Sequence, residues 1–153
     1  MKTRYLVSTL FILLLASCTS TKNTGGTRWY HAFNTRYNVY FNGNEAFKEA
    51  YKTQLENYTE NYSEMILMYP VSALPKEKAN SGGPFDKSIE KAVRAIKMHS
   101  IQEKPDKKPG KQNDPKYREF MSRTEYNPFL HNAWSLMAKS QFHNGDFIEA
   151  ASS

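Results

Sequence analysis

The chain carries a single cysteine, Cys18, which follows an apolar run near the N-terminus. Lys2 and Arg4 precede this run, and its ten residues, 6–15, are too few to cross a bilayer as a helix. A positive start, a short apolar stretch and then small residues are typical of a secretory signal peptide. We therefore expect residues 1–17 to be removed, and the mature chain has no thiol pair from which to build a disulfide.

The cysteine is preceded by Leu15, Ala16 and Ser17. This pattern resembles the lipobox of bacterial lipoproteins. The resemblance implies that the Cys18 thiol receives a diacylglyceryl group, that the chain is cut before Cys18, and that the new amino group is acylated. Several acyl chains hold a protein on a membrane essentially permanently. An ordinary cleaved signal with a chance cysteine, or an uncleaved anchor, is the alternative.

Removing residues 1–17 from the 153 leaves 136 residues, enough for one domain with a hydrophobic core. The formal net charge falls from +6 to +4, because Lys2 and Arg4 are lost with the signal. Stability then has to come from packing, for which the chain offers 10 Tyr, 9 Phe and 2 Trp residues. Residues 18–27, the lipidated cysteine and a small polar stretch with Gly25–Gly26, are expected to form a flexible tether.

Within residues 28–101, an N-terminal helical region, aromatic residues recur at steps of three and four, which predicts helices with one apolar face. The first helix is expected to end near Gly43, and the second to start at an Asn44 cap and to end near Asn57. We expect the apolar faces to pack into a core. Their members are Trp29, Phe33, Tyr37, Tyr40 or Phe41, Phe47, Tyr51, Leu55 and Tyr58.

Asp86 is expected to cap a third helix that runs to Ser100. Its inward residues are expected to be Ile89, Ala92, Val93 and Ile96. Residues 102–115 hold three prolines, one glycine and no other apolar residue, which predicts an exposed basic loop. Asp114–Pro115 and Asn127–Pro128 each favour a helix start, because a capping residue followed by proline is a preferred entry.

A pattern near the C-terminus resembles a tetratricopeptide repeat. The matching residues are Trp134, Met137, Ala138, Phe142, Gly145, Phe147 and Ala150. The small Ala138 and Ala150 let two helices approach closely, and Gly145 suits the tight turn between them. Because a lone repeat cannot bury its apolar face, we expect residues 116–153 to begin a repeat array. The chain is then expected to be the N-terminal piece of a longer protein or a truncated reading frame. An isolated helical hairpin is the alternative.

The lipobox and three later segments, 27–50, 88–101 and 127–150, together resemble the tetratricopeptide-repeat lipoproteins of Bacteroidota. They are most similar to the N-terminal region of the PorW/SprE lipoproteins of the type IX secretion and gliding machinery, most specifically in the string YNVYFNGNEAFKE. The resemblance implies an all-α fold in which helical hairpins lead into a tetratricopeptide-repeat (α-solenoid) array. It also implies a scaffold that joins protein partners of a secretion or envelope complex.

The residues after the lipobox bear on location. Thr19, and not an aspartate, follows Cys18, which under the sorting rule of enteric bacteria favours the outer membrane. Lipoproteins carried to the cell surface in Bacteroidota tend to have acidic residues there, whereas residues 19–27 contain none. We therefore expect the protein on the periplasmic face of the outer membrane, held by its N-terminal lipid. Export by this route argues against nucleic acid as a partner.

An enzyme would need a nucleophile, an acid–base group or a metal cluster in mutual reach. No paired metal spacing occurs among His31, His99, His131 and His143. We therefore expect no catalysis, no metal and no cofactor. The alternative function is a SusD-like glycan-binding surface lipoprotein with aromatic sugar platforms, against which the core spacing of many aromatic residues argues.

The basic loop has a functional interpretation as well. Six basic residues lie from Lys104 to Arg118, against Asp106 and Asp114. A solvated loop is the ordinary explanation of such a charge run. The alternative is an electrostatic contact with anionic lipid head groups, peptidoglycan or an acidic partner.

Overall fold

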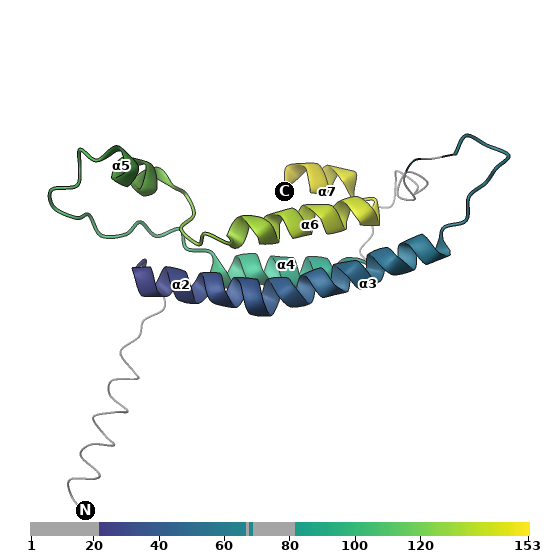
Figure 1. The fold of residues 1–153 in the computed structure, drawn as a ribbon, viewed down its shortest axis with the longest axis horizontal. Coiled ribbons are helices and arrows are strands. Elements are labelled where there is room, and N and C mark those ends of the chain that lie inside the picture. The colour runs from purple at the N-terminus through teal and green to yellow at the C-terminus, as the bar shows by residue number, and fades with distance from the viewer. Residues whose placement is uncertain (1–21, 67, 69–81) are drawn as a thin grey trace, which may run out of the picture.

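The computed structural model describes residues 22–66, 68 and 82–153, which form helices and connecting loops with no strand among them. A long helical rod lies along one side. Two helices, α4 (Asp86–His99) and α6 (Leu130–Asn144), pack against each other and against this rod (Figure 1). The predicted all-α class is confirmed, while the described residues form no stacked array of repeats.

Three helical segments follow one another without a break and make up the rod: α2 (Gly25–Asn34), the π-helix η1 (Thr35–Tyr40) and α3 (Phe41–Asn57). The predicted end at Asn57 is confirmed, whereas the predicted break at Gly43 and new cap at Asn44 are wrong. Gly43 is buried inside α3, where an added Cβ would lie 3.0 Å from Leu136 Cδ2 and 3.1 Å from Lys91 Cβ. This glycine therefore gives room for neighbouring helices and ends no helix.

The rod begins earlier than predicted. Asn23 is buried, and Thr24 caps α2 through a side-chain hydrogen bond to the first turn. Residues 25–27, the last part of the tether predicted over 18–27, are helical. The predicted tether therefore extends too far toward the C-terminus, since residues 25–27 belong to the rod.

The core lies where the rod, α4 and α6 meet. Ala92 and Ala95 of α4 and Ala133 of α6 are fully buried, with Leu136 beside them. The predicted inward residues of α4 lie on this side, since Ile89, Val93 and Ile96 are partly buried and pack against the same clusters. Small residues at the centre allow the three helices to approach closely.

Asp86 starts α4 but does not cap it, which corrects the prediction. Phe85 precedes the first turn, and no side chain caps it. The Asp86 carboxylate instead accepts hydrogen bonds from the Gly82 backbone N–H at 2.6 Å and from Asn144 Nδ2 at 2.8 Å. It thereby joins the start of α4 to the end of α6.

Residues 101–126, which we call the basic arm, leave the bundle and return to it. The arm contains α5 (Pro115–Ser122), which Asp114 caps as predicted. Its two ends meet where the Tyr126 backbone N–H donates to the Ile101 carbonyl at 3.0 Å. The arm is therefore a long connection between α4 and α6 whose two ends are hydrogen-bonded to each other.

The entry to α6 depends on Asn127, which is buried. Its Oδ1 accepts a hydrogen bond from the Phe129 backbone N–H at 3.0 Å, although the regular helix begins only at Leu130. Its Nδ2 donates to Thr35 Oγ1 at 3.0 Å and to the His99 carbonyl at 2.9 Å. One side chain thus connects the rod, the end of α4 and the start of α6.

Candidate functional site

Large aromatic side chains lie at steps of four along the solvent-facing side of the rod. We call them the aromatic stripe: Trp29, Phe33, Tyr37 and Phe41. Their exposed fractions run from 48 % for Phe33 to 67 % for Trp29. The prediction that these residues pack into the core is therefore wrong. A set of large rings left in water on one face is an exposed apolar patch, and such patches commonly mark interaction sites.

The first three rings of the aromatic stripe, those of Trp29, Phe33 and Tyr37, support one another. Trp29 and Phe33 are stacked, with centroids 5.4 Å apart and planes inclined by 24°. Phe33 and Tyr37 lie 4.9 Å apart, and the Arg36 guanidinium carbon is 5.1 Å from the Tyr37 centroid. Side chains held by such contacts have less conformational freedom to lose when a partner covers them.

A second set of residues, offset from the aromatic stripe by two positions, faces the bundle. Its members are His31, Thr35, Val39 and Gly43. Thr35, Val39 and Gly43 are small enough to let α4 and α6 approach, which large rings at these positions would prevent. In a regular α-helix a step of four drifts around the axis, because 3.6 residues complete a turn. The wider i→i+5 turns of η1 reduce this drift and keep both sets straight.

The aromatic stripe lies on a positively charged stretch. Between Cys18 and Glu45 the chain has no acidic residue, and its basic residues are Lys22, Arg28 and Arg36. Aromatic and Arg side chains are the residues enriched in protein–protein interfaces and their hot spots. We therefore take the aromatic stripe as the candidate docking surface.

The repeat-like pattern forms a helical hairpin. α6 ends at Asn144 and is capped by Gly145, whose φ of 92° is left-handed; α7 (Phe147–Ser152) follows. The Phe142 and Phe147 rings meet edge to face across the turn, with centroids 5.4 Å apart. The turn and the helix pair that the pattern predicts are thus present, in a single hairpin.

An open groove of about 460 Å³ lies along this hairpin. Its lining consists of Ala138, Lys139, Phe142, His143, Phe147, Ala150 and Ala151. Four of the predicted motif residues are thus brought together. Of the others, Gly145 forms the turn, Met137 is buried in the core and Trp134 is 39 % exposed.

Three histidines, His31, His99 and His143, have packing roles. His31 Nδ1 and His99 Nδ1 lie 3.0 Å apart where α2 meets the end of α4. Burial, and then the proximity of His31, lower the pKa of His99. Burial also lowers the pKa of His143, whose ring lies among Phe47, Tyr51 and other aromatic rings. Both imidazoles are therefore harder to protonate in the fold than in the unfolded chain.

Within the described part of the chain, no group of three or more His, Cys, Asp or Glu residues is placed to hold a metal ion. A polar groove of about 630 Å³ runs between the rod and α4. Glu45 and Glu49 line one wall, and Lys87, Lys91 and Arg94 line the other. Opposite charges on two facing helix surfaces are an ordinary solvated arrangement.

The sequence did not reveal that the basic arm is held against the start of the rod. Asn23 Nδ2 donates to the Glu103 carbonyl at 2.6 Å across 80 positions of sequence. The Arg28 guanidinium carbon lies 5.1 Å from the Phe120 ring centroid. Nothing in the local pattern around these residues signals such a contact, because periodicity and capping rules concern near neighbours only.

Comparisons of the chain with protein-family models, with curated proteins and with solved structures find no match. The predicted lipobox lies outside the described residues: Leu15, Ala16, Ser17 and Cys18. Among the residues that are described, no helix is both long and apolar enough to span a membrane. The functional argument therefore depends on the aromatic stripe, the hairpin, the basic arm and the sequence pattern at Cys18.

Proposed function

We propose that this protein is a lipid-anchored helical scaffold on the periplasmic face of the outer membrane, which docks protein partners and performs no reaction. The observation that carries the proposal is the aromatic stripe, an exposed row of four rings of which three contact one another. The resemblance of the chain to the PorW/SprE lipoproteins is strongest in the string YNVYFNGNEAFKE, and it further suggests a place in the type IX secretion and gliding machinery. Cys18 would supply the membrane attachment.

The size of the aromatic stripe sets the strength of docking. Burying the exposed parts of four aromatic side chains contributes roughly 3–6 kcal/mol, at about half of the value for full burial of each. Association costs about as much in lost freedom of the two partners. The stripe alone therefore gives weak docking, and a partner confined to the same membrane would gain from the high local concentration.

The C-terminal hairpin would extend the scaffold. A single hairpin of this kind leaves an apolar face open, and stacking of a neighbouring repeat normally covers it. We infer that the groove along α6 and α7 receives the first helix of a following repeat. Ala138 and Ala150 line the groove, and their small side chains allow such a helix to approach closely.

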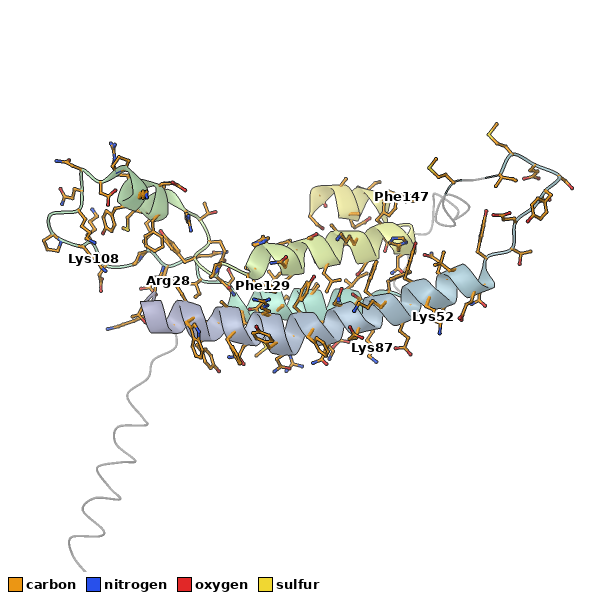
Figure 2. The ribbon with its side chains drawn as sticks, viewed as in Figure 1. Arg28, Lys52, Lys87, Lys108, Phe129 and Phe147 are labelled. Atoms are coloured by element: carbon orange, nitrogen blue, oxygen red, sulfur yellow. The ribbon has the colours of Figure 1, made fainter. Side chains whose placement is uncertain are left out.

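Site-specific photo-cross-linking in cells tests the docking surface. A photoreactive residue at position 33 is compared with one at position 52, which is exposed on the same rod beyond the aromatic stripe (Figure 2). We expect a discrete cross-linked partner from position 33 that is absent from position 52 and is lost with Trp29→Ser/Tyr37→Ser. Equal products from both positions, or none from position 33, would count against docking on the aromatic stripe.

A glycan-binding function is the second candidate, and the exposure of the aromatic stripe favours it more than the sequence did. A sugar platform needs a free ring face with hydrogen-bonding groups beside it. Here Trp29 and Phe33 stack on each other, and Phe33 and Phe41 have no polar atom, which favours protein docking. Protease shaving of intact cells separates the two candidates, since digestion without permeabilising the outer membrane would favour a surface glycan receptor.

A further inference from the structure

The basic arm presents a group of exposed cations. They are Lys104, Lys107, Lys108, Lys111, Lys116 and Arg118. None of them forms an ion pair with a described residue; the ion pair within the arm joins Arg123 and Glu119. The cations are therefore available to a charged partner.

Hydrogen bonds fix the shape of the basic arm. The Lys108 backbone N–H donates to the Tyr117 hydroxyl at 2.8 Å, which folds the lysine-bearing loop back onto α5. At the base of the arm, the Glu125 carboxylate accepts from Ser100 Oγ at 2.5 Å and from the Ile101 N–H at 2.8 Å. The lysines are thus presented by an ordered loop.

The basic arm docks on the first residues of the rod. Asn23 connects the two, since its Nδ2 donates to the Glu103 carbonyl and its Oδ1 accepts from Arg28 Nη1 at 2.6 Å. Arg28 also lies over the Phe120 ring. Figure 1 shows α5 at the same end of the molecule as the start of α2, and Figure 2 shows Lys108 and Arg28 at this end. The arm is therefore beside the point where the chain enters the fold.

Chain length then limits how far the basic arm can be from the membrane. Five residue steps separate Cys18 from Asn23, and a fully extended chain covers at most about 3.6 Å per step, or roughly 18 Å. On the proposed function, a lipid at Cys18 holds this end of the rod within that distance of the leaflet. Attraction between exposed charges is felt over about 8 Å at physiological salt, so a small reorientation brings the arm into range.

We propose that the basic arm is a second membrane contact, which binds anionic phospholipid head groups in the leaflet that holds the Cys18 lipid. This inference rests on the proposed lipid anchor for its location, but the attraction between lysines and phosphates does not require it. Each lysine close to an anionic leaflet strengthens binding roughly fivefold. A second contact would also fix how the rod and its aromatic stripe stand on the membrane.

Vesicle sedimentation tests the contact with the chain from residue 18 onward carrying Cys18→Ser, so that no acyl chain contributes. This chain contains every described residue. The arm variant K107Q/K108Q/K111Q is compared with K52Q/K87Q/K139Q, which removes the same charge elsewhere; Lys52 and Lys87 lie away from the arm (Figure 2). Circular dichroism verifies that both variants are folded. The control loses one exposed ion pair, Lys52–Glu56, which is worth little.

We expect the unchanged chain to bind vesicles that contain phosphatidylglycerol and not vesicles of phosphatidylcholine alone. The arm variant should bind roughly tenfold or more weakly, and the control variant should stay within about twofold of the unchanged chain. Equal weakening by both variants would show that only net charge matters, and would overturn the proposal. Absence of binding to the anionic vesicles by the unchanged chain would overturn it as well.

A buffer comparison separates a lipid head group from a free anion. When a chloride buffer is replaced by an inorganic phosphate buffer of the same ionic strength, vesicle binding should stay unchanged. Weaker vesicle binding in the phosphate buffer alone would show that the basic arm binds a small anion, and would reject the lipid contact. Because no lipid is attached to the tested chain, a failure here leaves the anchor at Cys18 standing, and a failure of acylation at Cys18 leaves this vesicle binding in place.

Discussion

Gly43 of α3 and Leu136 of α6 approach so closely that a Cβ on the glycine would lie 3.0 Å from Leu136 Cδ2. Lys91 of α4 limits the space from another side, with its Cβ 3.1 Å from the same point. The rod, α4 and α6 therefore meet at a residue without a side chain. The spacing of the bundle depends on this position.

Enlarging Gly43 should destabilise the bundle. We expect Gly43→Leu to lower the free energy of unfolding by about 1–3 kcal/mol, because overpacking forces neighbouring side chains and backbone apart. In Gly43→Ala the clash is opposed by a gain in helix propensity of about 1 kcal/mol, so the net change should be small. Urea unfolding followed by circular dichroism measures both. Wild-type stability in Gly43→Leu would show that the helices are not closely packed here.

Removing the Asn127 side chain should lower the free energy of unfolding more than removing an exposed amide side chain does. Asn127→Ala leaves the Thr35 hydroxyl, the His99 carbonyl and the Phe129 N–H without this partner. The Thr35 hydroxyl keeps its hydrogen bond to the His31 carbonyl. The two other groups cost about 1–3 kcal/mol each, so we expect the free energy of unfolding to fall by roughly 2–6 kcal/mol. The matched control is Asn113→Ala in the exposed loop, which should change little. Equal unfolding midpoints for the two variants would refute the connecting role of Asn127.

Stability should fall as the pH is lowered through the histidine range. The pKa values of His99 and His143 are lowered in the fold, chiefly by burial. The unfolded chain, with ordinary histidine pKa values of about 6.5, binds more protons below that pH, so acid favours unfolding. We expect a lower thermal midpoint at about pH 5.5 than at about pH 7.5. The double variant His99→Gln/His143→Gln should show a weaker dependence; an unchanged dependence would mean that other groups cause it.

Substitutions in the aromatic stripe should affect docking far more than folding. Phe33→Ser removes two ring contacts, each worth about 0.5–1.5 kcal/mol at most, from an exposed position. The buried Leu136→Ala should cost about 2–5 kcal/mol. Chemical unfolding of the two variants side by side gives the comparison. Equal losses would indicate that Phe33 is a core residue, as its spacing first suggested.

Local sequence signals predicted the features that near neighbours decide. The cap at Asp114, the end of α3 at Asn57 and the turn at Gly145 each depend on a capping side chain, on poor helix formers or on glycine. The exposed basic loop followed from composition alone. These features need no knowledge of what the segment packs against.

The failures concern contacts between distant segments. Periodicity correctly grouped Trp29, Phe33 and Tyr37 on one face, but it cannot say whether that face meets a neighbour. A step-of-four set containing Thr35 and Val39 runs along the same rod, and close helix packing selected the smaller side chains for the interior. For the same reason Gly43 was mistaken for a helix end.

Anchoring at Cys18 is the central claim, because it places both the aromatic stripe and the basic arm at a membrane. Metabolic labelling with a tagged fatty acid, followed by isolation of the protein, tests it directly. We predict that the wild-type protein carries the label and that Cys18→Ala abolishes it. A wild-type protein without label, or equal labelling of the Cys18→Ala variant, would contradict the account.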